Sequence, residues 1–414
     1  MTLFYTLIVH IIKRLLPVAG WFYPKIRPFY KGRQSQKDYQ SFDKKPHDKV
    51  IWMHCASLGE FEQGRPVLEK LKEELPTYKI LLTFFSPSGY EIRKNYDKVA
   101  WVCYLPWDTP RDVNIFLDYF QPDMALFVKY EIWPNTLRSL KKRQIPTVLF
   151  SGIFRAGQPY FKYHWFKQLL HSFDMFFVQD ERSLQLLQDN GIKHVSLSGD
   201  TRFDRVYDIS RNPVDLPLIQ AFVNHHKVLV AGSTWPKDEA LLVQYINQSA
   251  QPDEKFIIAP HVIDESHILQ IERSLTQSYR RYSRLSSGDS VDFQVLIIDS
   301  IGLLSQLYRF AQLAYIGGGF GVGIHNILEA ATYGVPILIG PNYQKFKEAK
   351  DLIQTGACIS VDSVEQGVKS IERLMADTDL CHSLGQESQA YISAHTGATS
   401  SVVNYVLEQQ NMST

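Results

Sequence analysis

The feature that most constrains the fold is an alternation of short apolar runs with helical patterns, which occurs twice along the 414 residues. The runs of the first half are KVIWMH (49–54), KILLTF (79–84), DMALFV (123–128), PTVLF (146–150) and DMFFV (174–178). Those of the second half are HKVLVAG (226–232), KFIIAP (255–260), FQVLIID (293–299), QLAYIGG (312–318) and VPILIG (335–340). Apolar strands that alternate with helices are typical of parallel sheets. The sequence therefore predicts an α/β chain with two doubly wound, Rossmann-like halves whose strand-to-helix loops face a central cleft.

The stretch between the two halves sets the predicted domain boundaries. Residues 204–217 are rich in charge and in residues that break helices and strands, so we place the boundary near residue 210. The predicted segments are residues 1–34, 35–210, 211–396 and 397–414. The second and third are the Rossmann-like domains. The helical pattern over 397–409 is expected to cross back and brace the first domain.

Charge and cysteine content exclude several classes of function. The chain has 44 Lys and Arg against 43 Asp and Glu, so no global charge favours a nucleic-acid partner. Its four cysteines are far apart, without C-x-x-C spacing: Cys55, Cys103, Cys358 and Cys381. Neither a zinc ribbon nor a disulfide framework is indicated, and a reducing cytoplasm is the simplest compartment.

The N-terminus combines an apolar stripe with positive charge. All the charged residues before Asp38 are basic, namely Lys13, Arg14, Lys25, Arg27, Lys31, Arg33 and Lys37. The apolar positions have helical spacing and include Phe4, Leu7, Ile8, Ile11, Ile12 and Leu15. The uninterrupted run before Lys13 is shorter than the ~20 residues of a membrane span. We therefore expect residues 1–34 to lie on an anionic membrane surface, with a core helix and solvated basic flank as the alternative.

The loop after the first strand contains a candidate catalytic carboxylate. Glu60 stands in SLGE (57–60), directly before an amphipathic helical pattern. The helix dipole is expected to stabilise its carboxylate and lower its pKa, so that it could remove a proton from an attacking hydroxyl. The alternative is a capping box, in which Ser57 and Glu60 only terminate the helix.

A glycine-dense turn in the second half is the candidate nucleotide site. IGGGFGVGIHNILE (316–329) is expected to place Gly318 and Gly319 against a phosphate, followed by a helix that carries His325, Asn326 and Glu329. Asn326 and Glu329 are three residues apart and would share a face toward a ribose diol. The glycines do not complete G-x-G-x-x-G, and no P-loop occurs, so a dinucleotide dehydrogenase and an NTPase are disfavoured. A tight turn before a capped helix is the alternative.

Other loops are expected to reach the same cleft. Ser233 and His261 each follow a second-half strand and could contact a phosphate or base, although a purely structural role for His261 is equally open. In the first half, Glu131 precedes a Pro-initiated helix, and Arg155 and Arg202 are candidate cations for an acidic sugar or lipid phosphate. The only D-x-D triplet, 377–379, is expected to cap a helix. No metal site or other cofactor is predicted.

Together these motifs resemble one family. SLGE (57–60), YEIWPN (130–135), GDTRFD (199–204), GST (232–234) and GGGFGVGIHNILE (317–329) are similar, in order and separation, to motifs of 3-deoxy-D-manno-octulosonic acid (Kdo) transferases. The resemblance spans about residues 45–350. It departs from the family at Gly323-Ile324, where a glycine pair is usual, and at His261, where an Arg is common.

The resemblance implies a fold, a pair of substrates and roles for individual residues. It implies a GT-B fold, CMP-Kdo as donor, a lipid A precursor (lipid IVA) as acceptor, no metal, and a membrane anchor at the cytoplasmic face of the inner membrane. Residues 35–210 would bind the acceptor and 211–396 the CMP-sugar. Glu60 falls on the catalytic base, and Asn326 and Glu329 fall on the CMP-binding helix. Ser57, Glu131, Arg155 and Arg202 are candidates for acceptor or Kdo binding.

The implied reaction is a direct displacement that inverts the anomeric centre. Glu60 would deprotonate an acceptor hydroxyl, which attacks Kdo as CMP leaves. Two alternatives remain at this point. One is a GT-B transferase that uses a UDP-sugar, and the other is a membrane-associated nucleotide-binding protein without catalysis, in which Glu60 is only a cap.

Overall fold

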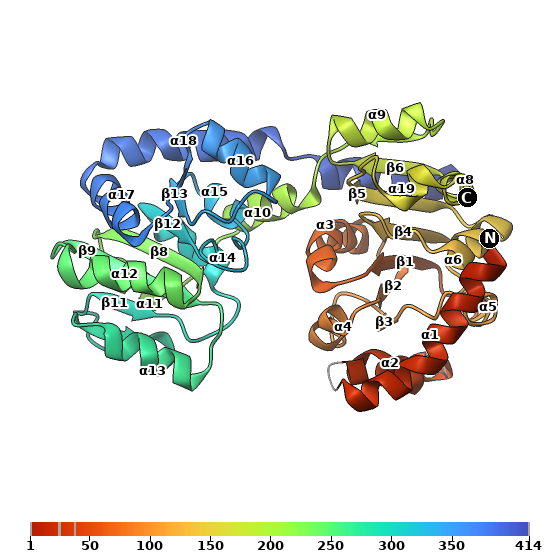
Figure 1. The fold of residues 1–414 in the computed structure, drawn as a ribbon, viewed down its shortest axis with the longest axis horizontal. Helices are drawn as coiled ribbons and strands as arrows, with labels where there is room; N and C mark the ends of the chain where they lie inside the picture. Colours follow the sequence, from red (N-terminus) through yellow and green to blue (C-terminus); the bar gives the residue numbers. More distant parts are fainter. Residues whose placement is uncertain (1, 24–25, 37–38, 413–414) are drawn as a thin grey trace. The chain divides into compact units, whose positions relative to one another are not determined.

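The chain folds into two compact units, each built around one parallel sheet (Figure 1). The computed structural model describes residues 2–23, 26–36 and 39–412. Lys25, Lys37 and Asp38, which contributed to the charge pattern of the N-terminus, lie outside the described residues. Unit 1 comprises Met1–Asp204 and Thr396–Thr414, and unit 2 comprises Arg205–His395.

Unit 1 contains a seven-stranded sheet with the order β3-β2-β1-β4-β5-β6-β7. All neighbouring strands are parallel. The strands are β1 (Val50–Cys55), β2 (Lys79–Phe84), β3 (Trp101–Tyr104), β4 (Met124–Val128), β5 (Thr147–Gly152), β6 (Met175–Val178) and β7 (Val195–Leu197). Since β1 lies between β2 and β4, the loops that follow β1 and β4 emerge side by side at the carboxyl edge of the sheet.

Helices cover both faces of this sheet. They are α3 (Leu58–Glu74), α4 (Pro87–Arg93), α5 (Pro110–Phe120), α6 (Pro134–Lys142), α7 (Pro159–Lys162), α8 (His164–Leu170) and α9 (Glu181–Asp189). Phe61 and Val67 of α3 pack on one face, where Val402 and Val406 of the C-terminal helix α19 (Ala398–Met412) join them. Trp52 and Phe116 belong to the core of the other face. The last helix of the chain therefore belongs to unit 1.

Unit 2 repeats the design with the strand order β10-β11-β9-β8-β12-β13-β14. Its strands are β8 (Lys227–Thr234), β9 (Glu254–Pro260), β10 (Tyr279–Arg281), β11 (Val295–Ile297), β12 (Leu313–Ile316), β13 (Ile337–Ile339) and β14 (Cys358–Ser360). Its helices are α11 (Pro217–Val223), α12 (Pro236–Gln248), α13 (Glu265–Ser274), α14 (Leu304–Leu307), α15 (Leu328–Ala331), α16 (Lys347–Gln354), α17 (Val364–Ala376) and α18 (Thr378–Ala394). Helix α10 (Thr201–Arg211) contains the boundary between the units.

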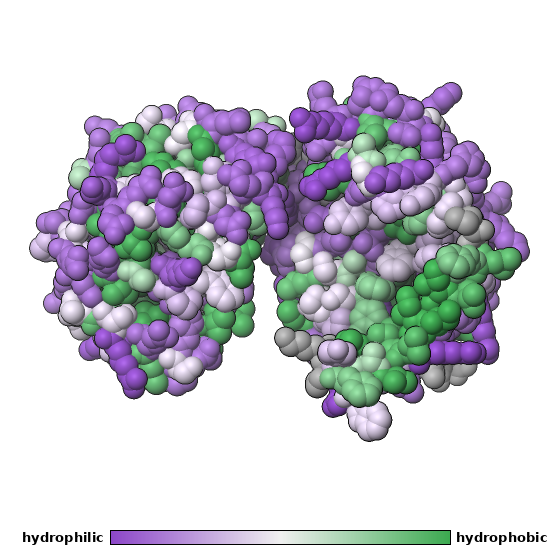
Figure 2. Space-filling view, viewed as in Figure 1, coloured by the Kyte–Doolittle hydropathy of each residue, from purple (hydrophilic) through white to green (hydrophobic). Residues whose placement is uncertain are grey.

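The N-terminal helix continues past the first two cations of the sequence. Helix α1 (Thr2–Phe22) continues through Lys13, Arg14 and Pro17, and residues 3–22 are long and apolar enough to cross a membrane by length and composition alone. The apolar run before Lys13 therefore does not set the length of the helix, because the helix does not end at its two cations. Figure 2 shows hydrophobic side chains gathered along α1 on the surface of unit 1.

One face of α1 is attached to unit 1 by polar contacts. Asn135 Nδ2 donates to Thr6 Oγ1 at 3.1 Å, and Lys13 Nζ lies 2.6 Å from Asp112 Oδ2. The Tyr5 hydroxyl hydrogen-bonds to Asp108. Helix α2 (Arg27–Ser35) follows α1 and buries Arg33 against unit 1. The helix is thus neither free of the domain nor part of its core, since one face is bound and the other is exposed.

Candidate active site

The first element of the site is the start of α3, which holds Glu60. Ser57 is the N-cap, and its Oγ accepts the Glu60 backbone N–H at 3.5 Å. The Glu60 carboxylate folds back and accepts the Ala56 N–H at 2.5 Å. The capping interaction predicted as the alternative is therefore present. It does not account for everything around Glu60, because the side chain is buried at 7% exposure next to a second carboxylate.

The environment of Glu60 reverses the expected direction of its pKa. Burial, followed by the negative charge of Glu131, raises the pKa of Glu60 to about 7. The Ala56 N–H and the charge of Lys129 oppose this effect without cancelling it. The prediction that the helix dipole would lower the pKa was wrong, because desolvation and a like charge outweigh a dipole that is worth about 0.3–1 kcal/mol. Glu60 is therefore poised to exchange a proton near neutral pH.

Glu131 is held in place beside it. Its Oε2 accepts the Trp133 indole N–H at 2.9 Å and lies 3.4 Å from His54 Nε2. His54, in β1, is fully buried, and its Nδ1 contacts Thr83 Oγ1 at 2.9 Å. Glu131 follows β4, the strand next to β1, so the sheet order brings it to the loop of Glu60. As expected, Glu131 precedes a helix that starts at a proline, α6.

Two residues to which the sequence assigned no role complete this part of the site. Lys129 directly follows β4 and has a φ of +64°, and its charge lowers the pKa of Glu60. Non-glycine residues adopt this left-handed conformation rarely, and such strain is common at functional sites. Tyr130 is the second: burial, Glu60 and Glu131 raise its pKa, and Arg155 opposes them. Arg155 thus lies within electrostatic reach of the site. Only their position beside Glu131 could have indicated Lys129 and Tyr130.

Arg202 has a partner of its own. Its Nη2 lies 2.9 Å from Asp200 Oδ2, and Asp200 also accepts Gln63 Nε2 at 2.9 Å. Gln63 is on α3, one turn after Glu60. Arg202 is therefore connected to the helix of Glu60 through Asp200, and a ligand carboxylate would have to compete with that pair.

The glycine turn of unit 2 is tightly packed by its own backbone. A Cβ on Gly317 would lie 2.3 Å from the Ser233 carbonyl oxygen, and one on Gly319 would lie 2.6 Å from the backbone of Gly340. The Gly318 N–H donates to Asp238 Oδ2 at 2.8 Å, and the His325 N–H donates to the Gly317 carbonyl. The close approaches explain much of the glycine content without a ligand, so phosphate binding by Gly318 and Gly319 stays a prediction.

The predicted pair Asn326 and Glu329 is present in a different local structure. Helix α15 begins only at Leu328, so His325 and Asn326 precede the helix instead of lying on it. Asn326 Nδ2 donates to Glu329 Oε1 at 3.0 Å. Burial raises the pKa of Glu329 above its ordinary value. The hydrogen bond from Asn326 and the charge of Arg205 act in the opposite direction without cancelling this effect. The pair is preorganised, with Arg205 as a neighbouring cation that the sequence did not indicate.

An aromatic stack lies beside this turn. The His261 ring is 4.3 Å from the His325 ring and 4.9 Å from the Trp235 ring, measured between centroids. Trp235 Nε1 donates to His325 Nε2 at 3.0 Å. Burial and the neighbouring His261 lower the pKa of His325 to about 4, so at neutral pH His325 is uncharged with its proton on Nδ1. Ser233, with a φ of +53°, lies two residues before Trp235.

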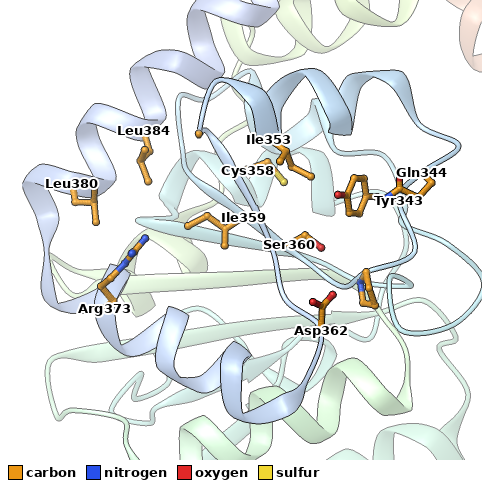
Figure 3. Close-up of a pocket in the computed structure, with 12 residues that line it drawn as sticks. Tyr343, Gln344, Ile353, Cys358, Ile359, Ser360, Asp362, Arg373, Leu380 and Leu384 are labelled. Carbon is orange, nitrogen blue, oxygen red and sulfur yellow. The ribbon is translucent and has the colours of Figure 1, made fainter.

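Two other features of unit 2 stand apart from these groups. A cavity of about 640 Å³ lies beside the edge strand β14 and is lined by Tyr343, Ser360, Asp362 and Arg373 among others (Figure 3). It contains none of the candidate residues. Asp377 caps α18 by accepting the Leu380 N–H at 2.8 Å, as the D-x-D triplet predicted. Within the described residues, no group of three or more His, Cys, Asp or Glu side chains could hold a metal ion.

Comparison with known proteins identifies the class of enzyme. Residues 31–205 match the family model of 3-deoxy-D-manno-octulosonic-acid transferases (kdotransferases). A 3-deoxy-D-manno-octulosonic acid transferase of Rickettsia bellii is 28% identical over 337 residues, which are 79% of each chain. That of Bordetella pertussis is 26% identical and covers 84% of this chain and 85% of its own. The chain is a glycosyltransferase related to the Kdo transferases.

Solved structures confirm the fold class. The UDP-GlcNAc 2-epimerase of Neisseria meningitidis, bound to UDP-GlcNAc, superposes with a TM-score of 0.58 at 16% identity, covering 87% of this chain and all of its own. MurG of Acinetobacter baumannii gives 0.54 at 13% identity and covers 87% of this chain and 99% of its own. Two Rossmann-like units in one chain, as in GT-B proteins, are the architecture that the strand pattern of this glycosyltransferase predicted.

Proposed function

We propose that this glycosyltransferase transfers Kdo from CMP-Kdo to a lipid A precursor, lipid IVA, in lipopolysaccharide synthesis. The similarity to the Kdo transferases named above supports Kdo as the sugar that is transferred. The observation in the structure that carries the chemistry is Glu60, a buried carboxylate at a helix start with a pKa of about 7. A group with this pKa is half deprotonated at neutral pH and can act as a general base.

The proposed step is a single displacement. An acceptor hydroxyl oxygen forms a bond to the anomeric carbon of Kdo, and Glu60 takes the hydroxyl proton. The bond between that carbon and the CMP phosphate oxygen breaks, and CMP leaves with the electron pair. Attack from the opposite face inverts the anomeric centre. Burial and the negative charge of Glu131 raise the pKa of the base. Arg155 is the candidate partner for the Kdo carboxylate.

Unit 2 is the proposed donor site. Glu329 and Asn326 would receive the ribose diol, while Ser233, His261 and the Nδ1–H of His325 would face the phosphate, beside Gly318 and Gly319. A monophosphate leaving group carries less charge than a diphosphate, so the proposal needs no metal ion and no other cofactor. Asp238 supports this arrangement because its carboxylate holds both the Gly318 and the Trp235 backbone N–H groups.

The decisive experiment mixes purified protein, CMP-Kdo and lipid IVA and analyses the lipid product by mass spectrometry. We expect a mass increase by one or more Kdo residues. UDP-sugars serve as control donors. Transfer from a UDP-sugar but not from CMP-Kdo would favour the other class of GT-B enzyme, and CMP binding without transfer from any donor would favour a nucleotide-binding protein.

The rate of transfer is expected to follow the ionisation of Glu60. The base must be deprotonated, so kcat/KM should rise about tenfold per pH unit below pH 7 and level off above it. In Glu131→Gln, a negative charge that raises the pKa is removed, and the rising limb should move to lower pH. If the native protein and Glu131→Gln have the same pH-rate profile, Glu131 does not influence the pKa of the base.

Glu329→Ala is expected to weaken CMP binding by about 10- to 100-fold, because a charged hydrogen-bond partner is lost. Glu329→Gln, which can still accept the Asn326 bond, should weaken it less. Calorimetry with CMP measures both variants, and Glu387→Ala on the exposed face of α18 is the matched control. Unchanged affinity in Glu329→Ala would remove this residue from the donor site.

A peripheral position at the cytoplasmic face of the inner membrane completes the proposal. Lys13 and Arg14 stand near the middle of α1, where a membrane-spanning helix would place them close to the bilayer centre at a cost of about 2.5–3.5 kcal/mol each. The polar contacts of Thr6 and Lys13 with unit 1 also occupy one side of the helix. Both facts support a helix that lies in the interface with only its exposed apolar face buried in lipid.

A further inference from the structure

A cavity of unit 1 that has no part in the chemistry above is lined by cations. It has a volume of about 670 Å³ and lies between α1, α2 and the loop from β3 to α5. Its basic lining residues are Lys13, Arg14, Arg33 and Arg111. Among the described residues that line the cavity, the only carboxylate is Asp112, which already pairs with Lys13 and accepts a hydrogen bond from Thr109 Oγ1. The cavity therefore has excess positive charge.

Arg33 is the buried part of this lining. It is 7% exposed, and three of its five N–H groups donate to the carbonyl oxygens of Phe29, Phe85 and Leu105. Among the described residues it has no carboxylate partner, and its guanidinium lies over aromatic rings that include Phe29 at 4.1 Å and Trp107 at 5.2 Å. Burial lowers the pKa of Arg33 to about 10, which leaves it charged at neutral pH. A buried cation without a counter-charge is costly, and an anion in the cavity would offset that cost.

Two more cations stand around the same cavity without a partner. Arg14 on α1 and Arg111 on α5 are exposed, and neither forms an ion pair with a carboxylate in the part of the chain that the structure describes. Guanidinium groups of this kind bind phosphate through paired N–H donors. Tyr30 and Trp107 also line the cavity, and such aromatic side chains are typical of the interface between membrane and water.

The residues around the cavity indicate which kind of molecule would supply the anion. The cavity borders α1, whose exposed residues include Leu7 at 56%, Ile11 at 47% and Leu15 at 58% (Figure 2). A ligand with acyl chains could lay them along this apolar face and place a charged headgroup among the arginines. We propose that this cavity binds the phosphate headgroup of an anionic membrane lipid. The cavity loop follows β3 at the carboxyl edge of the sheet that also presents Glu60 and Glu131, so a bound lipid would hold that edge at the membrane surface.

The test uses the full chain and a short-chain lipid below its micelle concentration, so that no membrane surface potential contributes. Calorimetry with dihexanoyl phosphatidic acid should show saturable binding of one lipid per chain, with much weaker binding of dihexanoyl phosphatidylcholine. Arg14→Gln and Arg111→Gln should each weaken it about 10- to 100-fold. Lys31→Gln, which removes the same charge from the exposed side of α2 without touching the cavity, should change it less than about fivefold.

Three outcomes would overturn the proposal. These are no saturable binding, equal effects of the cavity and control variants, and binding of inorganic phosphate as tight as that of the lipid. Equal effects would show general charge attraction, and tight inorganic phosphate would show a site without lipid selectivity. Thermal melting of each variant excludes unfolding as the cause. No donor or acceptor is present in the assay, so the result is independent of the proposed function.

Discussion

Glu60→Gln is expected to lower kcat for Kdo transfer by about 10²- to 10⁴-fold, because the substitution removes the proposed base and preserves its shape. The amide oxygen of Gln can still accept the Ala56 N–H that the carboxylate accepts in the native protein. CMP affinity should remain unchanged, because the proposed donor site is in unit 2. Glu73→Gln, the same substitution at an exposed position of α3, is the matched control and should retain full activity.

The stability of the Gln variant provides a second measurement with a defined sign. The folded state raises the pKa of Glu60 from 4.5 to about 7. The protonated side chain therefore contributes fully to the free energy of unfolding below pH 4.5, and this contribution is lost as the pH rises to about 7. Relative to the native protein, Glu60→Gln should thus gain up to about 3 kcal/mol across this window, measured by denaturant unfolding. A variant that is destabilised but fully active would show that Glu60 is only a helix cap.

Replacing Leu7, Ile11 and Leu15 together by Ser is expected to weaken binding to anionic vesicles by about a hundredfold or more. These side chains share the exposed face of α1, and each is worth about 1.5 kcal/mol or more when it enters an apolar environment. The contacts of Thr6 and Lys13 with unit 1 are untouched, so the protein should stay folded. Co-sedimentation with vesicles, scored beside thermal melting, measures both effects.

A matched control distinguishes this face from surface hydrophobicity in general. Ile92, Val214 and Ile301 are exposed at 59%, 56% and 93% and lie outside α1. Their replacement by Ser should leave vesicle binding within about twofold. If both triple variants bind vesicles like the native protein, α1 is not the membrane element.

The strands show where sequence patterns fail. The ten apolar runs predicted from the sequence match ten strands, and the four that were missed are β3, β7, β10 and β14, which are the edges of the two sheets. Each has only three or four residues. Three of these edge strands, β7, β10 and β14, are only partly buried, so they need no continuous apolar run, whereas β3 is fully buried and was missed all the same. Central strands are covered by neighbouring strands and helices, so their continuous apolar runs can be recognised in the sequence.

The candidate site shows a different limit. Glu60, Glu131 and the pair Asn326 and Glu329 were found because they follow strands at positions where parallel sheets collect functional loops. Lys129, Trp235 and Arg205 were assigned no role, because their local sequence gives them none beyond a place in or beside a candidate loop. Their importance arises from neighbours that are remote along the chain, such as His325 for Trp235.

The two parallel-sheet units, the apolar and basic N-terminal helix, and the resemblance to glycosyltransferases follow from the amino-acid sequence alone, because strand and helix periodicity and short motifs are local properties. The ionisation of Glu60 is a property of the folded chain, since its pKa depends on burial and on the carboxylate of Glu131, which follows the neighbouring strand β4. The same holds for the contacts of one face of α1 with unit 1 and for the four cations that line one cavity. Burial and charge proximity belong to the folded chain, so no local pattern contains them.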